Sequence, residues 1–62
     1  MMEKKYFVVI MEETVKKTRR GDIKVVYVPI EQKDGFSTYE EAEEWARRNA
    51  KGKTYNVGVY WE

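Results

Sequence analysis

The chain has 62 residues, no cysteine and no histidine, and its charged side chains nearly cancel to a formal net charge of +1 at pH 7. This near-neutral charge argues against an acidic DNA mimic and against a histone-like basic protein. A chain of this length has room for a single α+β domain, residues 1–62, that buries only about 60% of its unfolded surface. A disulfide is excluded and the usual zinc ligands are missing, so stability must come from packing, oligomerisation or both.

The amino-terminal segment carries one apolar run, Tyr6 to Met11, with acidic residues directly after it. A signal peptide or a membrane span needs a longer run, so we expect a soluble, cytoplasmic protein with no membrane role. The run is also rich in β-branched residues and predicts a first strand.

Residues 23–30, IKVVYVPI, predict a second strand, with Pro29 near its end because proline cannot donate to a ladder. Arg20-Gly21-Asp22 predicts the turn between the two strands, so residues 5–30 are expected to form a hairpin. The EQKDGF segment that follows predicts a second turn, with Asp34-Gly35 as its strongest signal.

STYEEAEEWARRNAKGK predicts an amphipathic helix. Ser37 or Thr38 is the expected N-cap, since each has a glutamate three residues later. Acidic residues crowd the first turns and basic residues the last, which complements the helix dipole. Gly52 is expected to end the helix, and Trp45 lies on its apolar face.

The carboxyl-terminal segment TYNVGVYWE alternates in the manner of a half-buried strand. The face expected to meet the helix consists of Tyr55, Val57, Val59 and Trp61. These elements predict a two-layer α+β fold of order β-β-α-β, with one helix packed on one face of a three-stranded antiparallel sheet of order 2-1-3. Trp45 and Trp61 are both expected in the core.

The first two strands are apolar on both faces, whereas one helix can cover only one face of the sheet. A soluble monomer seldom exposes so large an apolar patch. The apolar surface that the helix cannot cover predicts a homodimer or a protein partner on the helix-free face. The alternative is that the strand ends are half exposed and a loop folds over part of the sheet. Although the sequence leaves open which strand face is inward, the interface residues that we expect are Tyr6, Val8, Ile10, Val26, Val28, Ile30 and Tyr60.

Enzymatic chemistry has little support in the sequence. The usual nucleophile–base pairs need histidine or cysteine, and no carboxylate lies within an apolar run that would raise its pKa. Glycine-rich phosphate-binding motifs are also missing. We therefore predict a non-enzymatic protein with no cofactor, no metal site and no small-molecule substrate.

A cluster of cations surrounds the expected hairpin tip, with Asp22 as the nearby acid. The cluster consists of Lys16, Lys17, Arg19, Arg20 and Lys24. Such a basic β-ribbon can track phosphates, so nucleic-acid binding is the alternative function, although a solvated hairpin end explains the same charges. Arg20-Gly21-Asp22 also matches the integrin-recognition tripeptide, which requires an extracellular protein, while a glycine turn accounts for the same residues.

The segment GFSTYEEAEEWARRNAKGKTYNV is similar to a pattern common in small bacterial and phage-encoded proteins. With YFVVIMEE and VVYVPIEQ ahead of it, the chain resembles the small α+β domain of HicB-type antitoxins, in which two strands and a Pro…Gly segment precede a Thr-x-Glu-Glu-Ala helix. The chain lacks that family's DNA-binding segment and its Pro-Gly-Cys turn. The resemblance implies a mobile-element accessory protein that binds a toxin. We thus expect a small non-enzymatic interaction module that dimerises or binds a protein through the helix-free sheet face.

Overall fold

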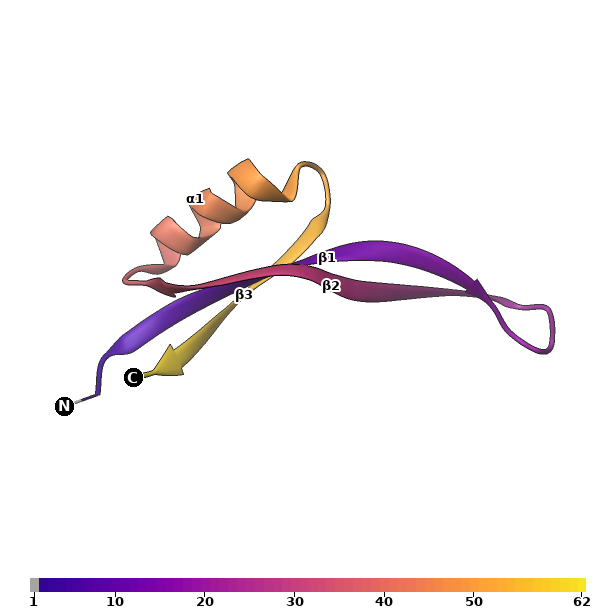
Figure 1. Ribbon diagram of the computed structural model, residues 1–62, viewed down its shortest axis with the longest axis horizontal. Coiled ribbons are helices and arrows are strands. Elements are labelled where there is room, and N and C mark those ends of the chain that lie inside the picture. Colours follow the sequence, from indigo (N-terminus) through magenta and orange to yellow (C-terminus); the bar gives the residue numbers. More distant parts are fainter. Residues whose placement is uncertain (1) are drawn as a thin grey trace.

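The computed structural model describes residues 2–62, which form three strands and one helix (Figure 1). In chain order the elements are β1 (Lys4–Lys17), β2 (Ile23–Phe36), α1 (Tyr39–Ala50) and β3 (Thr54–Trp61). The sheet order is β2-β1-β3, and the central strand β1 is antiparallel to both neighbours. The expected α+β fold and its strand order are confirmed. Within residues 2–62, no helix is long and apolar enough to cross a membrane.

Helix α1 begins and ends close to where the sequence predicts. Thr38 is the N-cap, and its hydroxyl oxygen accepts a hydrogen bond from the backbone N–H of Glu41 at 3.1 Å. The Glu41 carboxylate in turn accepts from the backbone N–H of Ser37 at 3.4 Å. At the other end Lys51 and Gly52 both adopt positive φ, which turns the chain toward β3.

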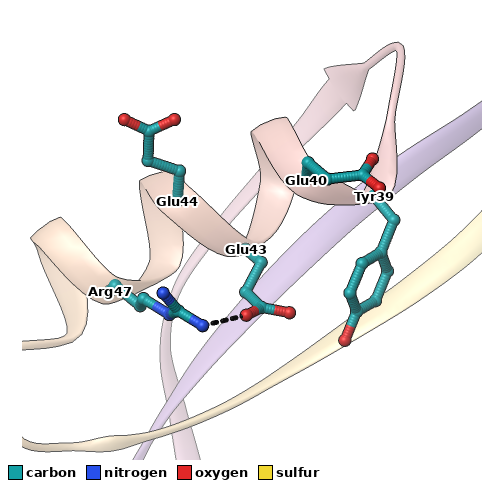
Figure 2. A pocket seen from close by; sticks show the side chains of 5 residues that line it. All are labelled: Tyr39, Glu40, Glu43, Glu44 and Arg47. Carbon is teal, nitrogen blue, oxygen red and sulfur yellow. Dashed lines mark hydrogen bonds and ion pairs between the residues drawn. The ribbon is translucent and has the colours of Figure 1, made fainter.

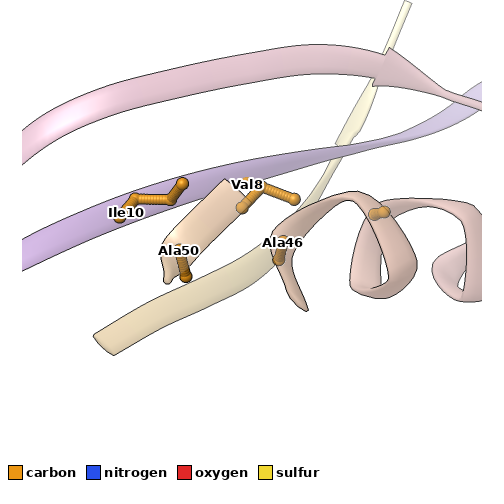
Figure 3. Close-up of a cluster of buried hydrophobic side chains, with 5 residues drawn as sticks. Val8, Ile10, Ala46 and Ala50 are labelled. Atoms are coloured by element: carbon orange, nitrogen blue, oxygen red, sulfur yellow. The ribbon is translucent and has the colours of Figure 1, made fainter. Parts of the chain in front are cut away.

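The core lies between α1 and one face of the sheet (Figures 1 and 3). Its fully buried members are Val8, Ile10, Ala42, Ala46 and Ala50. The small alanine side chains let the helix approach β1 closely, and larger rings close the margins. Trp45 is one of these, since its ring lies 5.9 Å from that of Phe36.

The strand face that meets the helix is the opposite of the one that we expected. Tyr6, Val8 and Ile10 were expected to point away from the helix, and this is wrong because Val8 and Ile10 are buried beneath it and Tyr6 packs beside them. Directly paired residues of an antiparallel ladder share a face. Val8 pairs with Val57 and Ile10 with Tyr55. Because Val57 and Tyr55 face the helix, Val8 and Ile10 face it too.

The same rule corrects the expected positions on β2. Val26 and Val28 pair with Thr14 and Glu12, so they lie on the helix side of the sheet rather than on its helix-free face. Ile30 has no direct partner because the pairing shifts there by one residue, which makes it the extra residue of a β-bulge.

Strand β2 is longer than the sequence predicts. The expected turn at EQKDGF is wrong because β2 continues through Phe36. Asp34 and Gly35 together lie opposite Phe7 and form a second bulge, in which Gly35 has φ 90°. Several types of turn and the glycine-type bulge alike contain a residue at positive φ, which glycine adopts without strain. Pro29 lies inside β2, where an edge strand tolerates it.

Trp61 is 60% exposed, so its expected place in the core is also wrong. It pairs with Lys4 at the end of the sheet. The ring contact between Tyr6 and Tyr39 lies two residues further in along β1, so the start of the helix falls short of Trp61.

The β1–β2 hairpin runs well beyond the helix (Figure 1). We call residues 12–28 the arm and the remainder of residues 2–62 the body. The molecule measures 52 × 25 × 13 Å, and its radius of gyration is 15.0 Å. A compact chain of this length has a radius of gyration of about 11 Å. The arm therefore projects from the body instead of folding against it.

Candidate interaction surfaces

The helix-free side of the sheet, which we call the outer face, carries the residues of β1 that alternate with the core set. They are Lys5, Phe7, Val9, Met11, Glu13, Val15 and Lys17. Their cross-strand partners complete the face. Of the expected interface, Tyr60 lies on this face, beside Phe7 with ring centroids 6.1 Å apart.

The body end of the outer face is covered by the chain's own aromatic rings. The Tyr60 hydroxyl accepts a hydrogen bond from the backbone N–H of Gly35 at 3.0 Å, so its side chain reaches from β3 across β1 to the bulge of β2. The Phe7 ring lies over Gly58, where an added Cβ would clash with it. Gly58 thus accommodates a ring of the same chain.

The arm end of the outer face has no such cover. Val15 pairs with Val25, and these residues are 62% and 47% exposed. Tyr27 and Ile23 extend the ribbon on either side, at 52% and 74% exposure. We call these four residues the arm patch. Alternation along residues 23–30 places Ile23, Val25 and Tyr27 on one face, whereas Val15 joins them only through its pairing with Val25.

The accessible surface reflects the uncovered arm. The chain exposes 5128 Å². A compact monomer of 7.5 kDa exposes about 4,250 Å². The excess, about 900 Å², is close to the area of about 800 Å² that each partner contributes to a standard protein interface.

The tip of the arm brings the expected cations together on an ordered turn. The backbone N–H groups of Thr18 and Gly21 donate to the carbonyls of Asp22 and Thr18, at 2.8 and 3.0 Å. The Asp22 N–H also donates to the Thr18 hydroxyl at 3.1 Å, and Gly21 has φ 90°. We call Lys16, Lys17, Arg19, Arg20 and Lys24 the basic tip.

Two cations of the basic tip face each other across the arm. Lys16 pairs directly with Lys24 on the helix side of the sheet, whereas Lys17 pairs with Ile23 on the outer face. Within residues 2–62 the ion pairs lie on α1 and near the amino terminus, and none of them includes a cation of the basic tip. The basic tip is therefore exposed, and its cations form no ion pair with Asp22 or with another acidic residue of residues 2–62.

Helix α1 carries a hollow of about 580 Å³ on its surface (Figure 2). Its lining consists of Tyr39, Glu40, Glu43, Glu44 and Arg47, all exposed or half-buried. Glu43 and Arg47 form an ion pair one turn apart, as the dashed line in Figure 2 marks.

The ionisable groups of this hollow interact with one another and with Tyr55 of β3. A hydrogen bond to Glu43, and the negative charge of that carboxylate, raise the pKa of Tyr39 above its ordinary 10.0. A hydrogen bond with Tyr55 and the charge of Glu43 raise the pKa of Arg47. Within residues 2–62, no group of three or more histidine, cysteine or acidic side chains could hold a metal ion. The polar groups of this hollow are explained by ion pairs and hydrogen bonds on the helix surface. The absence of enzymatic activity stays a prediction.

Comparison with known proteins finds no matching family model, no matching curated protein and no matching solved structure.

Proposed function

We propose that the protein is a non-enzymatic interaction module that self-associates, with two copies packed arm against arm through their outer faces. The observation that carries this proposal is the arm patch, an apolar ribbon on a projecting hairpin that no other part of residues 2–62 covers. Exposed apolar patches of this kind mark interaction sites.

A second copy is the occupant that the surface area favours. The excess of about 900 Å² per chain matches what each partner of a standard interface buries. A two-stranded hairpin alone is at best marginally stable in water, so the arm needs cover on at least one face. Sheets that pack face to face supply that cover and keep their strands within about 30° of one another.

The sequence of the outer face is also complementary to itself. A two-fold axis that crosses the strands at Val15 and Val25 places these residues against their own copies, as an isologous interface requires. The same axis sets Tyr27 of one copy against Ile23 of the other. It also sets Glu13 against Lys17 of the second copy, because both residues lie two positions from Val15 on the outer face.

Analytical ultracentrifugation over the micromolar range tests the proposal, with a matched pair of variants on one strand. Val25→Asp brings two carboxylates together at the two-fold axis, and we expect it to leave the protein monomeric. Val28→Asp changes an equally exposed valine of β2 that lies on the helix side, and we expect it to dimerise like the wild type.

Three outcomes would overturn this function. The wild type could stay monomeric at every concentration, both variants could weaken association equally, or the arm patch could be protected only by a different protein. The toxin-binding role implied by the antitoxin resemblance corresponds to the last outcome and stays a prediction.

A further inference from the structure

We propose that the basic tip binds the phosphate backbone of double-stranded nucleic acid. This inference does not depend on self-association. Lys16 and Lys24 lie on the helix side of the sheet, away from the outer face, and the two arginines lie in the turn itself. Both sets stay accessible when the outer face is covered.

The first observation behind the proposal is the arrangement of like charges. Lys16 and Lys24 are direct cross-strand partners, and like charges in that position destabilise a ribbon. Asp22 is the one acid between Thr14 and Ile30, and it forms no ion pair within residues 2–62. The mutual repulsion of the cations is relieved when each of them contacts a phosphate.

The second observation is the shape of the arm. A projecting two-stranded ribbon has its strands about 4.8 Å apart, and the major groove of B-form DNA, about 12 Å wide, admits such a ribbon. Hydrogen bonds from the backbone N–H groups of Asp22 and Gly21 to Thr18 close the turn. The arginines are therefore presented on an ordered end that reaches beyond the body (Figure 1).

A duplex fits this surface better than a single strand does. Binding of single strands relies on aromatic side chains on which bases stack. The turn carries no aromatic residue, and the nearest one, Tyr27, belongs to the arm patch on the outer face. The contacts available at the tip are charge-assisted hydrogen bonds to phosphate, which do not depend on base sequence.

Fluorescence anisotropy with a labelled DNA duplex of about 20 base pairs and arbitrary sequence, in about 50 mM salt, measures the binding directly. Lys17 lies on the outer face, against Glu13 of the second copy in the proposed dimer, so four cations of the tip are free to contact phosphates. Four phosphate contacts give a plot of log affinity against log salt with a slope of about −3.6. We expect Arg19→Gln/Arg20→Gln to weaken binding about tenfold or more and to reduce the steepness by about two. The matched control is Lys51→Gln/Lys53→Gln, which removes the same charge from the α1–β3 connection and is expected to change neither quantity.

Each result decides the question. A salt-dependent affinity that falls with the arginine variant and not with the control supports the tip as the site. The inference is overturned if the wild type does not bind the duplex in low salt, or if the control variant loses as much affinity. It is also overturned if vesicles containing phosphatidylserine are bound through the same arginines while the duplex is not. Ultracentrifugation of the arginine variant separates the two proposals, because we expect it to associate like the wild type.

Discussion

Strands β1 and β2 run through two regions of the molecule that stabilise them in different ways. In the body, α1 covers one face of the sheet, and the rings of Phe7 and Tyr60 cover part of the other. In the arm, residues 12–28 include no fully buried side chain. Yet the apolar alternation continues into the arm, where the helix no longer reaches. This chain therefore encodes more sheet surface than it can itself bury.

The largest effect is expected from equivalent truncations in the two regions of β1. Ile10→Ala empties a fully buried position, and we expect it to lower the free energy of unfolding by about 3 kcal/mol. Val15→Ala changes an exposed arm residue, so at dilutions where the protein is monomeric we expect a loss below about 0.5 kcal/mol. Urea denaturation measures both. Equal losses at low concentration would show that the arm is packed within the monomer.

Charge reversal across the proposed two-fold axis comes next. Either Glu13→Lys or Lys17→Glu alone replaces two attractive pairs of the dimer with two repulsive ones. We expect each to weaken dimerisation by about 2 kcal/mol, since an exposed pair contributes up to about 1 kcal/mol. The double variant restores opposite charges, so it should dimerise like the wild type. A double variant no stronger than the singles would exclude this register, although not dimerisation itself.

Most of the fold could be predicted from the sequence because its signals are local. The helix cap at Thr38 and the helix-facing positions of Tyr55 and Val57 depend on neighbours within a few residues, and both are confirmed. The face of β1 could not be predicted in the same way. It depends on pairing between residues about fifty positions apart, such as Val8 with Val57, and a shift of one residue exchanges the two faces.

The candidate sites divide along the same line. The basic tip could be predicted because its cations all lie between residues 16 and 24, on the two sides of a single turn. The arm patch was missed because its membership follows from strand register and from where the helix ends. At Asp34-Gly35 the positive φ of the glycine was predicted correctly, but the turn was not. A positive φ at glycine occurs in a bulge as well as in a turn.

The self-covered end of the outer face provides a third test. Gly58→Ala introduces a Cβ into the Phe7 ring, which must rotate away from Gly58. We expect a loss of about 1.5 kcal/mol in the free energy of unfolding, limited because the clash involves the far end of a side chain that can move. Asn56→Ala, two residues earlier on the same face of β3, serves as the control with a much smaller loss. Losses of equal size would indicate that the ring does not lie over Gly58.

The smallest effect is expected from removing one tyrosine hydroxyl in each region. Tyr60→Phe removes the acceptor of the Gly35 N–H across the sheet, and we expect the free energy of unfolding to fall by about 1 kcal/mol. Tyr27→Phe removes the hydroxyl oxygen from a tyrosine of the arm patch. The Tyr27 side chain is half exposed and forms no hydrogen bond with another side chain or backbone group described in residues 2–62. Monomer stability should be unchanged there, and dimerisation should be preserved or strengthened because the ring becomes more apolar. Chemical denaturation at low concentration, with ultracentrifugation of the same samples, measures both quantities. If Tyr27→Phe destabilised the monomer as much as Tyr60→Phe, Tyr27 would have to contact the body. The description of the arm patch as uncovered in the monomer would then be wrong.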